Sequence, residues 1–211
     1  MNWNTRILVF TAFISVIATA CVHMIPESTH VKTTNYLLTE TTAELPPADS
    51  DFLNGAFFYV RPVELASYLG DSRIVSRTSP NKVSFSGNHR WGEPLEEGIG
   101  RVVGKNLSGL LGTLNYSAYP NRQKLRHDFE IGITIDRFER VAKDRVSLVG
   151  SWQLLKRKEQ VFVGSLAETE NIKSASKPGV DKIGEVAALS QVLRNVSERI
   201  ATEIVRRLAQ E

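Results

Sequence analysis

Cysteine is nearly absent from this sequence, and its scarcity excludes several classes of protein. Cys21 is the only cysteine among 211 residues, so the chain cannot form an internal disulfide framework or a thiolate zinc cluster. The four histidines lack the i, i+4 spacing of a helical metal site, and we expect no metal and no other cofactor. They are His23, His30, His89 and His127.

The motifs of common catalytic sites are also missing. The chain contains no G-x-S-x-G, no P-loop and no dinucleotide-binding glycine pattern, and it has no second cysteine to serve as a thiol nucleophile. Ser, His and Asp residues occur, but their spacing does not assemble a triad. We therefore predict no catalytic residues and a protein that is not an enzyme.

Neither sign of charge dominates, and long apolar runs are scarce. The 26 Lys and Arg residues stand against 23 Asp and Glu, so the concentrated basic face of a nucleic-acid-binding protein is not expected. The one long apolar run extends from Ile7 to Ala20. It has 14 residues, fewer than the roughly 20 that a membrane-spanning helix needs. The sequence thus favours neither a nucleic-acid partner nor a transmembrane helix.

The N-terminal apolar run has the layout of a secretory signal. Arg6 supplies one positive charge before it, and the run closes with small residues directly before Cys21. A signal that ends small-small-Cys resembles the bacterial lipobox, although Ala18 replaces the Leu that is usual three places before the cysteine. The alternative is a secreted protein that is cleaved after Ala20. Because a lone thiol has no disulfide partner in an oxidising compartment, we favour lipidation of Cys21.

These features divide the chain into three parts. We predict a signal peptide over residues 1–20, a lipidated tether over residues 21–32 and one domain over residues 33–211. The tether is polar and short, as suits a flexible spacer. The domain is long enough to bury a core of its own.

Periodicity predicts the main elements of the domain. Alternating apolar and polar residues predict strands over 125–136, 145–156 and 160–167, joined by short turns as antiparallel neighbours. Apolar residues at helical spacing predict helices over 94–111 and 181–209. Shorter strands are predicted over 33–41, 56–61, 73–77, 82–86 and 114–118. The expected fold class is α+β, with a mixed, largely antiparallel sheet covered by two long helices in a single domain.

Three further expectations concern the packing of these elements. Gly98, Gly100 and Gly104 weaken the first helix, so we expect it to pack closely against the sheet. His127 falls on the core side of its strand, where a hydrogen-bonded interior histidine is expected. The last helix is amphipathic, with an apolar stripe that begins at Ile183 and Val186, and could lie on a membrane or bind a partner. We favour a core position for it, because the three amphipathic strands need a cover for their apolar face.

A series of short motifs runs through the domain in a defined order. They are Val60-Arg61-Pro62-Val63, Leu65, Tyr68-Leu69, Arg73-Ile74-Val75, Arg90-Trp91-Gly92-Glu93-Pro94-Leu95 and Asn106-Leu107. A strand with Phe129 and Phe138, a strand with Trp152 and the amphipathic helix follow. In this order, after a lipobox, the motifs resemble the bacterial lipoproteins of the PqiC type, which are auxiliary lipoprotein components of ABC-type transport systems. The resemblance spans nearly the whole mature chain.

The resemblance implies a non-enzymatic role at the outer membrane. Such lipoproteins work with an MCE-domain protein and inner-membrane transporter components to move lipids across the envelope and maintain its integrity. Val22 fits an outer-membrane lipoprotein that faces the periplasm, because an Asp at this place is the usual inner-membrane retention signal. We expect an accessory or docking subunit that is held to the membrane by lipidated Cys21. Whether it forms a homo-oligomer stays open.

Two other functions and the binding surface also stay open at this stage. The glycine-bearing helix could leave room for an acyl chain, which would make the protein a periplasmic lipid carrier. A hydrolase would need a pocket with converging polar groups. As residues that bind the partner we predict Arg77, Asn88, His89 and Arg90.

Overall fold

Three long strands form the largest part of the sheet, and each arises where apolar and polar residues alternate. They are β7 (Phe129–Ala142), β8 (Arg145–Lys156) and β9 (Glu159–Asn171), and consecutive strands pair in antiparallel order. The side chains of β7 that the alternation assigns to the core are buried, namely Phe129, Ile131, Ile133 and Ile135. The predicted meander is thereby confirmed.

The computed structural model describes residues 32–40, 55–121, 127–173 and 182–208. All helices and strands named here lie within one compact unit, Thr33–Glu211. The predicted signal peptide, the lipidation site Cys21 and nearly all of the tether lie outside the described residues. Their assignment stays a prediction from the sequence.

Within the described residues, six shorter strands complete one mixed sheet of nine strands. They are β1 (Thr34–Tyr36), β2 (Phe58–Val60), β3 (Glu64–Leu65), β4 (Arg73–Ser79), β5 (Lys82–Trp91) and β6 (Tyr116–Ala118). A 3₁₀ helix, η2 (Ser67–Gly70), follows β3 where a turn or short helical piece was predicted. The α+β class with a mixed sheet is confirmed.

The expectation of a largely antiparallel sheet needs correction. Among the described residues, five of the eight strand pairings are parallel, and the three antiparallel ones are the long pairings β4·β5, β7·β8 and β8·β9. Short turns between neighbouring strands are visible in a sequence, so hairpins are predicted readily. Parallel pairs join segments that are distant in the chain, and no local pattern indicates them.

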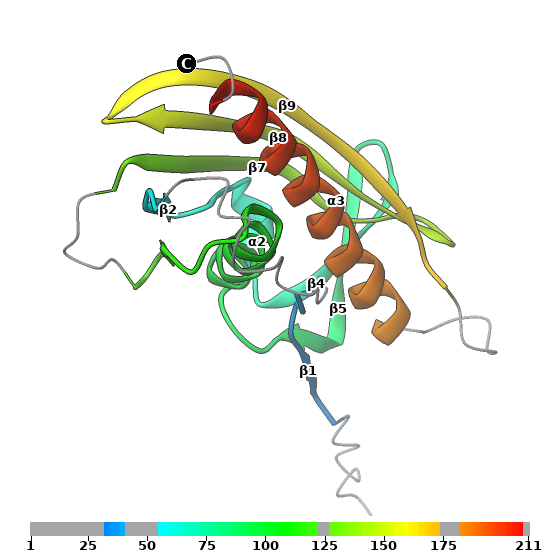
Figure 1. Ribbon diagram of the computed structural model, residues 1–211. Coiled ribbons are helices and arrows are strands. Elements are labelled where there is room, and N and C mark those ends of the chain that lie inside the picture. Colours follow the sequence, from blue (N-terminus) through cyan, green and yellow to red (C-terminus); the bar gives the residue numbers. More distant parts are fainter. Residues whose placement is uncertain (1–31, 41–54, 122–126, 174–181, 209–211) are drawn as a thin grey trace, which may run out of the picture. The chain divides into compact units, whose positions relative to one another are not determined.

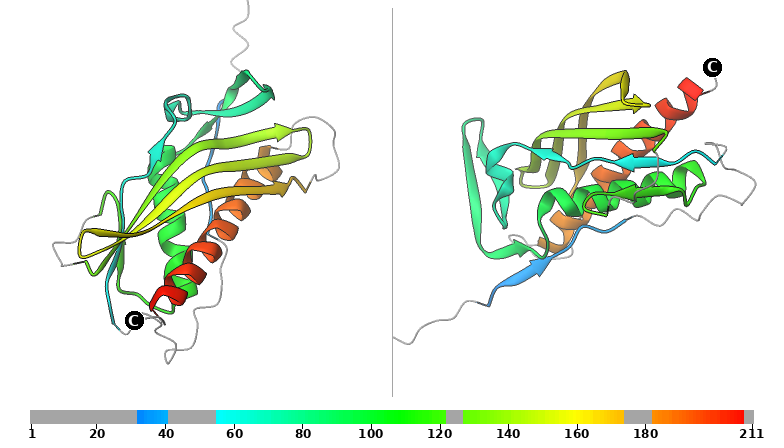
Figure 2. Two further views of the ribbon diagram at one scale, coloured as in Figure 1. Left: turned by 90° about the horizontal axis from the view of Figure 1, so that it is seen from above. Right: turned by 90° about the vertical axis from the view of Figure 1, so that its left-hand side faces the viewer.

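Both predicted helices are present, and they pack on each other and on the sheet. They are α2 (Leu95–Leu111) and α3 (Lys182–Leu208), and α3 runs along β7, β8 and β9 (Figures 1 and 2). Helix α2 ends at Gly112, whose φ of 66° is the left-handed conformation that closes many helices. A Cβ on Gly104 would lie 3.2 Å from the ring of Tyr116, which confirms the close packing expected of this helix.

Two individual predictions about burial are wrong. Ile183 was assigned to the buried stripe of the last helix but is 73% exposed, because it lies in the first turn of α3, before the stripe reaches the core at Val186. The Nε2 atom of His127 is buried without a hydrogen-bond partner among the described residues. Its ring packs instead against Phe57 and Tyr59, with a centroid distance of 4.8 Å to Tyr59. In the described part of the chain, neither helix is long and apolar enough to cross a membrane.

Candidate functional site

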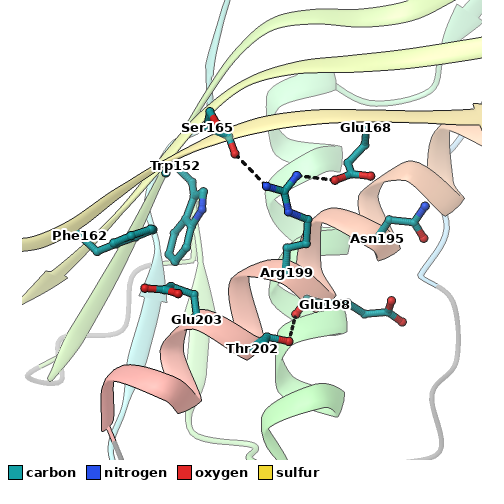
Figure 3. A pocket seen from close by; sticks show the side chains of 10 residues that line it. Trp152, Phe162, Ser165, Glu168, Asn195, Glu198, Arg199, Thr202 and Glu203 are labelled. Carbon is teal, nitrogen blue, oxygen red and sulfur yellow. Dashed lines mark hydrogen bonds and ion pairs between the residues drawn. The ribbon is translucent and has the colours of Figure 1, made fainter. Parts of the chain in front are cut away.

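A groove between helix α3 and the β8–β9 hairpin is the leading candidate for a binding site. It has a volume of about 690 Å³ (Figure 3). Its walls come from two parts of the chain, one on the strands and one on the helix. The lining residues are Trp152, Phe162, Gly164, Ser165, Glu168, Asn195, Glu198, Arg199, Thr202 and Glu203.

The apolar wall of the groove is an aromatic pair that depends on a glycine. The β8–β9 register places Trp152 opposite Gly164. A Cβ on Gly164 would lie 2.8 Å from Trp152 Nε1 and 2.8 Å from Phe162 Cε1. Because the glycine has no side chain, the two rings can meet over it, with their centroids 5.0 Å apart at an interplanar angle of 53°.

The opposite wall is charged, but its charges are already paired within the chain. Arg199 contacts Glu168 at 2.5 Å, and Glu198 pairs with Arg194 at 2.6 Å. Glu203 receives hydrogen bonds from two arginines of α3, and the bond from Arg206 contributes most to lowering the pKa of its carboxyl. The groove therefore presents a polar, charge-balanced surface rather than a strong site for a single ion.

The same helix covers the free edge of the sheet. Strand β9 pairs only with β8, so its other side is an unpaired edge among the described strands. Arg199 donates to the backbone oxygen of Ser165 at 3.4 Å, and Arg207 donates to that of Val161 at 3.3 Å. The Arg207 guanidinium also lies 4.5 Å from the centre of the Phe162 ring. These contacts occupy backbone acceptors that another strand would otherwise bind.

The lining residues have the chemistry of a contact surface. Ser165 and Thr202 are the hydroxyl side chains, and Thr202 donates its hydrogen bond to the backbone oxygen of Glu198 at 2.8 Å. The described lining contains no histidine or cysteine that could serve as base or nucleophile. No group of His, Cys, Asp and Glu in the described part of the chain could hold a metal ion.

Arg77, predicted to bind a partner, is turned into the domain. Its Nε contacts Glu139 Oε1 at 2.6 Å, and the Glu139 side chain has no exposed surface while that of Arg77 is 17% exposed. The hydroxyl of Tyr68 donates to Glu139 Oε2 at 2.7 Å. Burial, followed by this hydrogen bond, raises the pKa of Tyr68 to about 12. We define these three residues as the Glu139 cluster.

The other predicted contact residues lie together on β5, away from the Glu139 cluster. His89 and Arg90 face β1 in the parallel β1–β5 pairing, and Asn88 precedes them. The Tyr36 hydroxyl is hydrogen-bonded to His89 Nδ1 at 3.0 Å, and Arg90 donates to Ser72 Oγ at 3.0 Å. The structure thus brings Asn88, His89 and Arg90 together and separates them from Arg77, which pairs with Val83 near the β4–β5 turn.

Sequence patterns alone do not identify the groove. The i, i+4 pair of Arg194 and Glu198 can be read from the helix, and so can Glu203 with Arg207. The contact of Arg199 with Glu168 joins residues 31 positions apart and depends on how α3 lies on β9. The aromatic wall could be predicted from Gly164 opposite Trp152, but only once the register of the β8–β9 hairpin is known.

Comparison with known proteins identifies one family and a shared fold. A family model described as "ABC-type transport auxiliary lipoprotein component" matches residues 36–201. A crystal structure of an uncharacterized protein has 20% sequence identity and a TM-score of 0.66, over 82% of this chain and 99% of that chain. A Xanthomonas campestris protein of the DUF330 family has 17% identity and a TM-score of 0.65, over 84% and 99%. At these identities the two structures show the fold alone. No curated protein sequence matches this chain.

Proposed function

The chain belongs to the family of ABC-type transport auxiliary lipoproteins, and from this membership we propose that it is the accessory docking subunit of an MCE-type lipid transport system. In this proposal it is a non-enzymatic lipoprotein of the outer membrane that faces the periplasm. Its partners are an MCE-domain protein and inner-membrane transporter components. The assembly moves lipids between the membranes and maintains envelope integrity.

The packing between the helices and the sheet is the observation that favours docking over lipid carriage. A carrier needs an apolar cavity that holds an acyl chain. Here the facing side chains fill that space, and these residues have no exposed surface: Ile99, Val102, Val103, Leu107, Leu111, Leu189, Val192 and Ile200. The groove of about 690 Å³ lies outside this core and has a charged wall. These features support contact with a protein surface rather than with a lipid tail.

Anchoring through Cys21 completes the proposal. Each buried methylene of an acyl chain contributes about 0.8 kcal/mol to membrane binding, so several chains hold a protein where one is marginal. Val22 in place of Asp supports sorting to the outer membrane. Asn88, His89 and Arg90 are half-buried on β5 and are the proposed contacts to the partner. Arg77 would support them indirectly, by holding the β4–β5 hairpin through Glu139.

A binding measurement tests the docking proposal. The full-length lipidated chain, reconstituted in nanodiscs, is presented to the purified periplasmic region of the MCE-domain protein from the same organism. We expect saturable binding in biolayer interferometry. An absence of binding by the folded chain would contradict the docking role.

Native mass spectrometry separates docking from the alternative, a periplasmic lipid carrier. The domain purified without its anchor is expected to carry no phospholipid, because its core is filled by side chains. A stoichiometric bound phospholipid would instead identify a carrier. The same spectra give the oligomeric state of the domain.

A further inference from the structure

The turn between β8 and β9 has an unusual backbone. It is a two-residue loop, Arg157-Lys158, between the paired residues Lys156 and Glu159. Arg157 has a φ of 50° and Lys158 a φ of 72°, which is the left-handed region at both positions. Two-residue hairpin loops of this kind favour Asn-Gly, because side chains such as Arg and Lys are strained there. Strain that persists at a defined position is a reason to look for a function.

The two strained residues are also unpaired cations. Both side chains are exposed, and neither forms an ion pair within the described residues. The arginines of α3, by contrast, are paired with Glu168, Glu198 and Glu203. The Arg157 amide donates to the backbone oxygen of Asp128 at 3.2 Å, which fixes the turn to the start of β7. Within the described part of the chain, the turn therefore holds two positive charges without an acidic partner, in a defined position.

Exposed apolar side chains follow these cations along strand β9. Val161 is 39% exposed and Val163 is 55% exposed. Since alternate residues of a strand point to the same face, the two valines lie on one side of β9. We define Arg157, Lys158, Val161 and Val163 as the hairpin tip. Free cations next to apolar side chains are the composition of a protein interface with a polar rim and an apolar centre.

The hairpin tip lies far from the point where the chain enters the domain. In Figure 1 the β8–β9 turn lies at the upper left of this unit and strand β1 lies at its lower edge. The chain reaches the unit at β1 after the tether. The tip is therefore separate from the end of the unit where the chain enters, and its two cations favour an acidic protein surface as its occupant.

We infer that the hairpin tip is a docking site for an acidic protein surface with an apolar centre, on the periplasmic partner of the proposed transport system. This inference rests on the proposed function and deepens it. Arg157 and Lys158 attract and orient the acidic surface, while Val161 and Val163 bury apolar area against its centre. The strained backbone keeps both cations directed outward from the end of the hairpin.

A pair of double variants tests the inference. Arg157→Asn/Lys158→Gly removes both charges and introduces the sequence that this turn favours, so the variant is expected to fold at least as well as the unchanged chain. Lys143→Gln/Arg145→Gln removes two charges at the β7–β8 turn, at the other end of β8, and is the matched control. Both side chains are exposed, like those of Arg157 and Lys158.

Each full-length chain is placed in neutral nanodiscs. Its binding to the periplasmic region of the MCE-domain protein is then measured from about 0.05 to about 0.3 M NaCl. We expect the tip variant to bind roughly tenfold more weakly at low salt and to lose most of its salt dependence. The control should stay within about twofold of the unchanged chain. Val161→Thr/Val163→Thr, which keeps the shape of both side chains, should weaken binding without altering its salt dependence.

The outcomes distinguish the two proposals. If the unchanged chain does not bind the MCE region, the proposed function fails and this inference fails with it. If the unchanged chain binds and the tip variant binds equally well, the docking role of the tip alone is overturned. The role of the tip as a protein-binding site is also overturned if the tip variant still binds the MCE protein but no longer binds phosphatidylcholine vesicles that contain phosphatidylglycerol. That result would assign the tip to a membrane surface.

Discussion

Glu139 is a carboxylate without exposed surface, and it joins β7 to two elements that precede it in the chain. It accepts hydrogen bonds from Arg77 on β4 and from Tyr68 in η2. A buried charge is tolerated only when partners replace its hydration, and removal of one partner leaves the other without compensation. The Glu139 cluster therefore couples the motif around Tyr68 to the long strands.

Loss of the Glu139 charge should destabilise the fold. We expect Glu139→Gln to lower the free energy of unfolding by about 3 kcal/mol, because Arg77 is left largely buried without its counter-ion. Urea denaturation followed by far-ultraviolet circular dichroism measures this change. Glu198→Gln is the control, since the Glu198 side chain is 49% exposed in its pair with Arg194 and should cost less than about 1 kcal/mol. Equal losses of unfolding free energy for the two variants would show that the buried Glu139 charge does not stabilise the contact of β7 with β4 and η2.

The pKa of Tyr68 predicts a stability change in alkaline solution. Burial and then Glu139 raise this pKa from 10.0 to about 12 in the folded protein. A group whose pKa is higher in the folded chain than in the unfolded chain stabilises the fold at any pH below the unfolded pKa. This contribution is lost as the pH rises through the folded pKa, because the unfolded chain ionises first. Here the folded chain binds the proton more tightly, so the unfolding free energy falls with rising pH between the two pKa values. Between pH 10 and pH 12 it should therefore fall more steeply for the unchanged chain than for Tyr68→Phe. Parallel curves from urea titrations across this range would rule out the effect.

Gly164 should not accept even a methyl group. Its Cβ would lie 2.8 Å from both aromatic rings of the groove, and Trp152 is 4% exposed and cannot move aside freely. We expect Gly164→Ala to lower the free energy of unfolding by about 2 kcal/mol and to change the near-ultraviolet circular dichroism of the tryptophan. Gly87→Ala is the matched control, because Gly87 is also in a strand but a Cβ there would have no neighbouring atom within 4 Å. An unchanged tryptophan signal in Gly164→Ala would contradict the tight packing of the two rings over this glycine.

Among the elements, the β8–β9 turn is where local sequence preference and backbone disagree. Arg157→Asn/Lys158→Gly should raise the free energy of unfolding by about 1 to 2 kcal/mol, because the left-handed backbone is unfavourable for Arg and Lys. Thermal and urea denaturation measure the gain. Because stability and function often oppose each other at a functional position, we expect this variant to be more stable but to bind its partner more weakly. A variant no more stable than the unchanged chain would show that Arg157 and Lys158 do not strain the turn.

The elements also show what sequence patterns can and cannot predict here. Both helices and β8 agree with their predicted ranges, because apolar periodicity is a local property. Strand β9 extends past its predicted end at Ala167 to Asn171, since the polar residues of an edge strand give no apolar alternation. The parallel pairings and the contact of Arg199 with Glu168 depend on tertiary packing. For the same reason the groove and the inward direction of Arg77 could not be predicted.

At the scale of the whole molecule, charge is distributed unevenly although the total is nearly balanced. The arginines along α3 are neutralised by neighbouring glutamates, and those near β7 are neutralised by Glu139 and Glu185. Within the described residues, Arg157 and Lys158 at the β8–β9 turn form no ion pair, and neither do Lys143 and Arg145 at the β7–β8 turn. The exposed cations of the β8–β9 turn are therefore available to the acidic surface that we propose for the partner.

Membrane placement of the whole molecule is predicted to depend on Cys21. In the proposed function, the acyl chains on Cys21 supply the attachment. We expect Cys21→Ala to move the protein from the membrane fraction to the soluble periplasmic fraction. The released domain should keep the melting temperature of the anchored one, because Cys21 lies in the predicted tether, before the domain.

The same variant should also weaken function through the loss of tethering. An anchored domain meets its partner at a high effective concentration, and a free domain does not, so overall binding can fall by about 10² to 10⁴ without loss of any contact. We therefore expect Cys21→Ala cells to become sensitive to detergents, and overproduction of the soluble variant to restore resistance in part. Cys21→Ser serves as a second non-lipidated variant and should behave alike. If either variant stayed in the membrane fraction with normal detergent resistance, the anchoring proposal would be wrong, and the free charge at the hairpin tip would need another explanation.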